Sequence, residues 1–191
     1  MRTNTLPIMR LASIILITLT LAVSAFAQQG LKTGSVAPEF TVDGMDGNTY
    51  DLNDYKGKVV VMTFWSSKCT ICHEEIPKLN RLATRYRDQN VVFLALTMEN
   101  EAKVSAYIKN TPFDFTILPN SFGVVLQYAD RDRAGNIDMG FPAYFIVDQT
   151  GGIQMKASGW DKTSSVDSQI SKLLASRSGR DTAVAAVASP K

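Results

Sequence analysis

The sequence is poor in cysteine and histidine: its 191 residues contain two cysteines and one histidine. Two cysteines cannot build the disulfide framework that stabilises many small secreted domains. An excess of charge is lacking as well, because 18 acidic residues nearly balance 20 basic ones. The chain therefore has no basic stripe of the kind that binds nucleic acid, and no nucleic-acid partner is expected. Internal repeats are absent too, and only one apolar run is long.

That apolar run lies at the N-terminus, from Leu11 to Phe26, and Arg2 and Arg10 are the only charges before it ends. The pattern predicts a secretory signal peptide over residues 1–27, cleaved after small residues that suit a signal peptidase. We therefore expect an exported, periplasmic protein that is not stably inserted in a membrane after cleavage. The alternative is an uncleaved segment that anchors the chain to the outer face of the inner membrane.

The rest of the chain divides by composition into three parts. A short N-terminal linker is expected over residues 28–33, and a single domain over residues 34–175. Residues 176–191 are small and polar, which predicts a disordered C-terminal tail.

The domain is predicted to be α/β. From residue 58 the chain has a β-branched apolar run, then an amphipathic segment, then a second apolar run. This order indicates a βαβ unit with two parallel strands. A glycine pair near residue 151 predicts a hairpin that adds antiparallel strands. The expected strands are 58–64, 91–98, 143–148 and a fourth after residue 152, and the expected helices are 70–88, 101–110 and 164–175.

Both cysteines and the histidine lie in one stretch, "FWSSKCTICHEEIP", residues 64–77. The spacing of Cys69 and Cys72 is that of a thiol-disulfide redox centre, whereas the same cysteines followed by His73 also match the attachment site of c-type haem. The motif follows a buried strand in an α/β chain, and this favours the redox centre.

Two separated motifs give the chain a family resemblance. The order of elements, the opening "GSVAPEFTVDGMDGNTYDLNDYKGKVVVMTFW" and the later "GFPAYFIVDQTG" are similar to the exported TlpA/ResA-like branch of the thioredoxin family. The resemblance implies a thioredoxin-like fold, with a central mixed β-sheet flanked by helices and an added N-terminal β-hairpin. It also implies a thiol-disulfide oxidoreductase that uses no cofactor or metal.

The resemblance assigns roles around the cysteines. Cys69, at the start of the helix, is expected to attack a substrate disulfide, and the more buried Cys72 to resolve the mixed disulfide. Thioredoxins of the cytoplasm place a buried aspartate where this chain has Thr63. The proton of the second thiol is therefore expected to pass to Glu75, which shares a helix face with Cys72.

Four residues are expected to bind the substrate. Pro142 matches the cis-proline of the family, and the backbone of Phe141 before it would pair with an extended substrate like an added strand. Trp65 is expected to pack and to form a wall of the site. Lys68 stands where the family often has tryptophan, so substrate docking is expected to differ.

The implied partners are proteins with disulfides or dithiols and an upstream electron donor in the membrane. We expect a monomer that acts as a reductant. The alternative is a thiol peroxidase, which shares the "APEF"-like opening. Its proline and threonine before the reactive cysteine are replaced here by Met62 and Ser66.

A calcium-like loop is the last candidate site. Residues 130–138, "DRDRAGNID", place aspartates at positions one, three and nine and a glycine at six. The position that needs a bidentate glutamate is Phe141, so we expect a solvated insertion and no metal site.

Overall fold

A computed structural model of the chain describes residues 30–187. The predicted signal peptide, residues 1–27, lies outside this range. The elements in chain order are β1 (Thr41–Asp43), β2 (Thr49–Asp51), the 3-10 helix η2 (Leu52–Tyr55), β3 (Val59–Phe64), α2 (Thr70–Arg85), β4 (Val91–Leu96), α3 (Glu101–Ile108), β5 (Thr116–Leu118), α4 (Phe122–Tyr128), β6 (Asp130–Arg131), β7 (Ile137–Asp138), β8 (Ala143–Val147), β9 (Ile153–Ser158) and α5 (Thr163–Val187).

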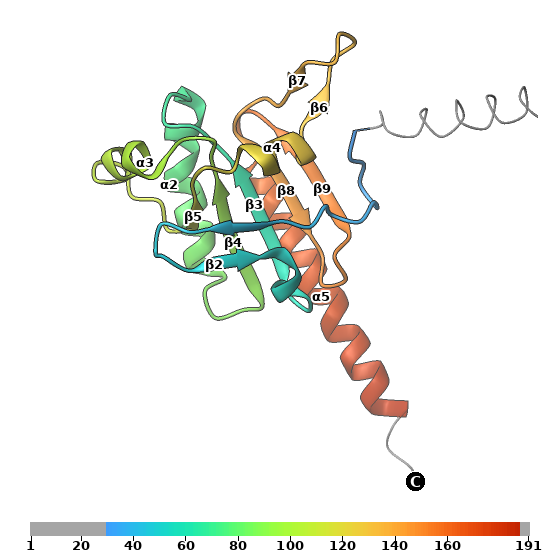
Figure 1. Cartoon of the computed structure of the whole chain (residues 1–191). Helices are drawn as coiled ribbons and strands as arrows, with labels where there is room; N and C mark the ends of the chain where they lie inside the picture. Colours follow the sequence, from blue (N-terminus) through green and yellow to red (C-terminus); the bar gives the residue numbers. More distant parts are fainter. Residues whose placement is uncertain (1–29, 188–191) are drawn as a thin grey trace, which may run out of the picture. The chain divides into compact units, whose positions relative to one another are not determined.

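The centre of the fold is a five-stranded mixed sheet in the order β5-β4-β3-β8-β9 (Figure 1). Strands β3, β4 and β5 are parallel, whereas β8 pairs antiparallel with both β3 and β9. The antiparallel hairpin β1–β2 is separate from this sheet. The prediction of a mixed α/β sheet with an added N-terminal hairpin is confirmed.

Strand β3 holds the central position because its sequence suits burial on both faces. All six residues of "VVVMTF" are buried, as are all five of β8. Side chains alternate along a strand, so Val61 and Trp65 belong to one core cluster and Met62 and Phe64 to the other.

Each face of the sheet has its own cover. Helices α2 and α5 pack on the face that carries Val61, while the hairpin region and α4 pack on the face that carries Met62. In Figure 1 the first pair lies behind the sheet and the second in front of it. Leu31, from the predicted linker, packs against the second cluster.

The sequence predictions missed several short elements. Strand β5 has three residues and α4 has seven, which is too short for a clear hydrophobic period. The expected solvated insertion is a small hairpin, β6–β7. In its turn the Asp132 carboxylate accepts from the N–H groups of Ala134 and Asn136 at 2.8 and 2.9 Å. Among the described residues no cluster of acidic, cysteine or histidine side chains suits a metal.

The last helix is longer than predicted. Helix α5 continues to Val187, whereas the sequence pattern predicts a tail without regular structure from residue 176. Three alanines favour a helix there, and the first proline after residue 175 is Pro190. Within residues 30–187, no helix has both the length and the apolar character needed to cross a bilayer.

The packing of α2 gives a first prediction. Leu79 is 1% exposed and joins α2 to the sheet, so Leu79→Ala should lower the free energy of unfolding by about 2–5 kcal/mol through the cavity it leaves. Chemical denaturation followed by circular dichroism measures this. The matched control is Arg81→Ala on the exposed face of the same helix, which should change stability by less than about 0.5 kcal/mol.

Candidate active site

A disulfide joins Cys69 and Cys72 at the N-terminus of α2, with 5.2 Å between their Cα atoms. Cys69 is the N-cap residue, and its sulfur accepts a hydrogen bond from the Cys72 N–H at 3.1 Å. The two sulfurs differ in access, because Cys69 is partly exposed and Cys72 is 1% exposed. One sulfur can therefore meet a partner while the other faces the core.

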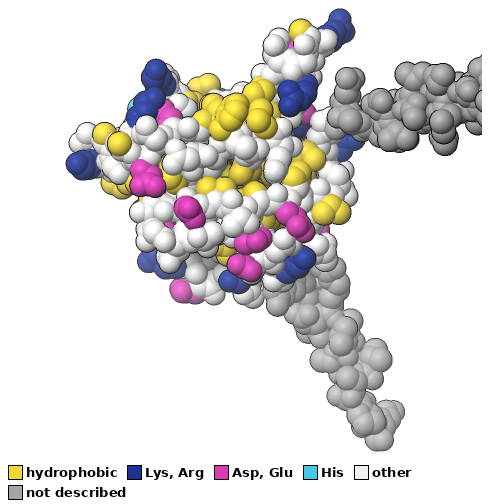
Figure 2. All heavy atoms as spheres, viewed as in Figure 1, with side chains coloured by type: hydrophobic (Ala, Val, Ile, Leu, Met, Phe, Trp, Pro, Cys, Tyr) yellow, Lys and Arg dark blue, Asp and Glu magenta, His cyan; other side chains and the backbone are white. Residues whose placement is uncertain are grey.

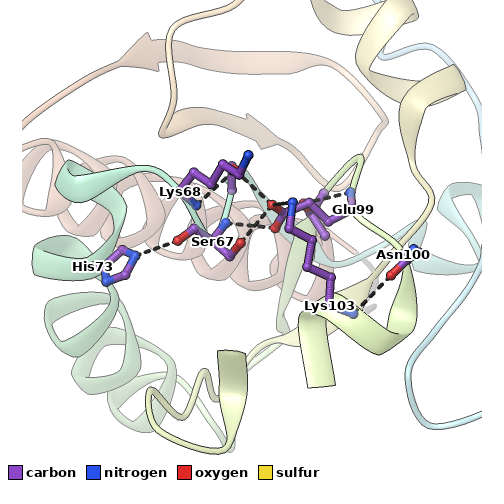
Figure 3. A network of polar contacts seen from close by, with 8 residues as sticks. Ser67, Lys68, His73, Glu99, Asn100 and Lys103 are labelled. Carbon is purple, nitrogen blue, oxygen red and sulfur yellow. Dashed lines mark hydrogen bonds and ion pairs between the residues drawn. The ribbon is translucent and has the colours of Figure 1, made fainter. Parts of the chain in front are cut away.

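The loop before Cys69 is fixed by an acidic side chain from another element. The Glu99 carboxylate accepts from the Ser67 N–H at 2.8 Å, from the Ser67 hydroxyl at 2.8 Å and from the Ser66 hydroxyl at 3.3 Å (Figure 3). Lys103 lies 3.0 Å from the same carboxylate. Burial alone would raise the pKa of Glu99, but these donors outweigh it and hold the pKa below its usual value.

His73 supports the same loop from the helix side. Its Nε2 donates to the Ser67 carbonyl oxygen at 2.9 Å, and its ring lies edge-on to Tyr107 with 4.9 Å between ring centroids. Ser67 is therefore held at its N–H, its hydroxyl and its carbonyl. The histidine is exposed, and its position beside the cysteines is explained by these contacts.

The predicted substrate residues differ in access. Phe141-Pro142 is a cis peptide bond, as predicted, and it immediately precedes β8. Because Ala143 pairs with Phe64 at the end of β3, this peptide lies at the same sheet edge as the cysteines. Lys68 is exposed on the cysteine loop.

Trp65 does not form an exposed wall. Its side chain is 1% exposed, and its ring packs against Tyr107 and Phe113 with centroid distances of 5.2 and 5.6 Å. The expected contact between this ring and a substrate is therefore not available, and Trp65 supports the loop from beneath.

Glu75 is buried on the face of α2 that carries Cys72. It is 0% exposed, and its carboxylate accepts from Lys78 Nζ at 2.7 Å and from the Thr163 hydroxyl of α5 at 3.0 Å. Replacing it with alanine would remove both contacts and leave a cavity. A Glu75→Ala variant is therefore expected to disturb the packing of α2 against α5.

An apolar surface borders the cysteine loop. Met98, Phe122 and Leu126 are 42, 50 and 36% exposed, and Figure 2 shows hydrophobic side chains gathered around α4. The Asn120 N–H donates to the backbone oxygen of Glu99 at 2.9 Å, which ties the start of this surface to the network around Ser67. Large exposed apolar patches can mark sites where a protein contacts other proteins, membranes or ligands.

Glu99 was not found from the sequence, although a signal exists. It follows β4 closely, and the C-terminal ends of parallel strands meet at one edge of a sheet, where sites form. A polar residue just after β4 was therefore a candidate neighbour of the residues just after β3.

The Glu99 network gives a second prediction. Glu99→Gln should lower the free energy of unfolding by about 1–3 kcal/mol at pH 7, because charge-assisted hydrogen bonds to Ser67 are lost. The folded-state pKa of Glu99 lies below its unfolded value of about 4.3, so the wild-type advantage is full above that pH and disappears as the pH falls through the folded pKa. Urea titrations at several pH values measure it.

The control is Glu101→Gln at the exposed start of α3, which should change stability by less than about 0.5 kcal/mol at each pH. An equal loss in both variants, or a Glu99 effect that persists at pH 2, would contradict the assigned role.

Known proteins resemble this chain in sequence and fold. The chain is 27% identical over 147 residues to the thiol-disulfide oxidoreductase ResA of Bacillus thuringiensis subsp. konkukian, which covers 76% of this chain and 81% of the relative. It is 31% identical over 128 residues to the thioredoxin-like protein YneN of Bacillus subtilis, with 65% and 71% covered. A crystal structure of a putative thiol:disulfide interchange protein DsbE from Chlorobium tepidum has the same fold, with a TM-score of 0.67 and 23% identity over 76% of this chain and 99% of that one.

The ResA and YneN relatives confirm the resemblance inferred from the two motifs. A family model, described as the AhpC/TSA family, matches residues 33–156. This match includes β3, the cysteine motif, the cis-proline and most of the sheet. The chain therefore belongs to the AhpC/TSA family of thioredoxin-fold proteins.

Proposed function

We propose that this protein is an exported thiol-disulfide oxidoreductase that reduces disulfides in other proteins through Cys69 and Cys72. The observation that carries the proposal is the asymmetry of the pair, one sulfur partly exposed at a helix N-terminus and the other buried. The relatives named thiol-disulfide oxidoreductases support the reaction class. The N-terminal sequence pattern supports export.

Cys69 is the attacking thiol in this proposal. In the reduced state, the free N–H groups at the start of α2 face its sulfur, and the helix dipole adds a partial positive charge. Both favour the thiolate, which is the reactive form. The thiolate attacks one sulfur of a substrate disulfide, forms a mixed disulfide and releases the other substrate sulfur as a thiolate.

Cys72 completes the reaction. Its thiol loses a proton, and the thiolate attacks the Cys69 sulfur, which releases the reduced substrate and leaves the Cys69–Cys72 disulfide. We assign Glu75 as the acceptor of that proton, because it is a buried carboxylate one helical turn from Cys72. An upstream dithiol donor in the membrane then reduces the pair again.

Substrate proteins bind where the cysteine loop and the cis-proline meet. The Phe141 peptide precedes the first residue of β8 and so lies outside the β-ladder, which leaves its N–H and C=O for an extended substrate strand. The apolar surface of Met98, Phe122 and Leu126 offers a second area of contact to a folded partner. A monomer suffices for this chemistry, because both sulfurs come from one chain.

A thiol peroxidase is the second candidate, since the AhpC/TSA name covers antioxidant proteins as well. Ser66 could hold the position of the peroxidase threonine, but its hydroxyl lies 3.3 Å from the Glu99 carboxylate. A second cysteine one turn away favours disulfide exchange over peroxide chemistry. Haem attachment at the same cysteines receives no support from the fold, in which they form a disulfide.

The assignment of Cys69 gives a third prediction. With limiting iodoacetamide at pH 7, Cys69 of the reduced protein should be labelled before Cys72, and Cys69→Ser should abolish reduction of insulin disulfides. Cys72→Ser should instead trap a mixed disulfide with the substrate. Mass spectrometry of the labelled peptides and a turbidity assay measure these outcomes.

Earlier labelling of Cys72, or insulin reduction by Cys69→Ser, would contradict the assignment. Rapid consumption of hydrogen peroxide by Cys72→Ser, together with an inactive wild type in the insulin assay, would favour the peroxidase.

A further inference from the structure

Two buried hydroxyls on the sheet face beneath α2 have no role in the function described so far. Thr63 is 1% exposed and Tyr144 is 0% exposed. Within residues 30–187, neither hydroxyl has a hydrogen-bond partner. A buried polar group without a partner is costly to stability, and apolar residues of the same shape would avoid that cost. These hydroxyls therefore call for a functional explanation.

The two hydroxyl residues lie side by side on the sheet face that packs against α2, the helix that carries Cys72. Thr63 on β3 is the register partner of Tyr144 on β8, and paired residues project from the same face of a sheet. Tyr144 belongs to the core cluster that contains Cys72, Val61 and Trp65. Side chains alternate along this stretch, so Thr63 projects to the same side as Val61 and Trp65, toward the same cluster.

The Glu75 carboxylate reaches this region from the helix. Its two contacts, Lys78 and Thr163, leave further acceptor positions on its oxygens. Burial raises the pKa of the Tyr144 phenol, and the negative charge of Glu75 raises it further. The phenol therefore remains a hydrogen-bond donor, and Glu75 is buried one helical turn from Cys72 on α2.

We propose that the hydroxyls of Thr63 and Tyr144 hold one buried water between Cys72 and Glu75, and that the proton of the Cys72 thiol passes along this path. A buried water needs two to four polar partners, and in this proposal the two hydroxyls, the Cys72 thiol and the Glu75 carboxylate are those partners. The two hydroxyls are positioning residues, because they orient the water and do not touch the reacting sulfurs. The proposal rests on the proposed function, since it concerns the resolving step of that reaction.

The step balances in protons and electrons. The water takes the thiol proton while it gives one of its own to the Glu75 carboxylate, so Cys72 becomes a thiolate and Glu75 a carboxylic acid. The thiolate forms the Cys69–Cys72 bond and breaks the bond between Cys69 and the substrate sulfur. The substrate leaves as a thiolate, and the two electrons that it gains come from the pair.

Several groups around the path carry or can carry charge. Lys78 contacts Glu75 from α2, and Asp161 before α5 lies 3.7 Å from Lys78. Tyr144 contributes a neutral phenol from β8. His73 is exposed and donates to the Ser67 carbonyl, away from this path. Removing either hydroxyl leaves these charges in place, so a change in the pH profile would report the path itself.

The test separates the two sulfur steps with Ellman's reagent, a small aromatic disulfide that releases one coloured thiolate when Cys69 attacks and a second when Cys72 resolves. In stopped-flow experiments on the full reduced chain, Tyr144→Phe and Thr63→Val should keep the first phase. Both variants should slow the second phase about tenfold at pH 7. The pH at which this phase reaches half of its maximal rate should rise. Thr63→Ser, which keeps the hydroxyl, should restore the wild-type rate.

Tyr128→Phe is the matched control on the opposite face of the sheet. Its buried hydroxyl donates to the Pro38 carbonyl at 2.7 Å, so this variant should lose stability but keep both kinetic phases. Tyr144→Phe should show the reverse, with unchanged or higher stability and a slow second phase.

A wild-type second phase in Tyr144→Phe and Thr63→Val would overturn the inference, and so would an equal slowing in Tyr128→Phe. The absence of any first phase in the wild type would instead overturn the proposed function, which separates the two failures.

Discussion

Burial of one face of α2 against the centre of the sheet determines where both sulfurs lie. Cys72, Ile76 and Leu79 follow one another along this face and are each 1% exposed. Because they are buried against β3 and β8, the first residue before the helix must emerge at the sheet edge, where Cys69 caps the helix. The difference in access between the two cysteines, on which the proposed chemistry depends, is therefore a consequence of core packing.

Polar contacts hold the segments around both cysteines in addition to the core packing. Glu99 and His73 hold Ser67 from two sides, so the loop between β3 and α2 has a defined path to Cys69. Glu75 and Thr163 join α2 to α5 beneath the second sulfur. Each network uses residues far apart in the sequence. The first holds the loop that precedes Cys69, and the second lies one helical turn from Cys72.

The sequence predicts the parts that have a strong local pattern. Strands β3, β4 and β8, helix α2 and the cis-proline are where the hydrophobic period and the two motifs place them. The contact between Glu75 and Thr163 could not be predicted, because these residues are 88 positions apart in the sequence. In the sequence, Tyr144 looks like an ordinary strand residue. Its pairing with Thr63, and the lack of a hydrogen-bond partner for its hydroxyl among the described residues, are seen only in the structure.

The proposed function requires that the Cys69–Cys72 pair act as a reductant of other disulfides. The most direct test is its reduction potential, measured by equilibrating the protein with mixtures of reduced and oxidised dithiothreitol and quantifying free thiols. A reductant requires a potential near or below about −250 mV, and we expect this value for the Cys69–Cys72 pair. A potential near −120 mV, typical of a strong oxidant, would contradict it.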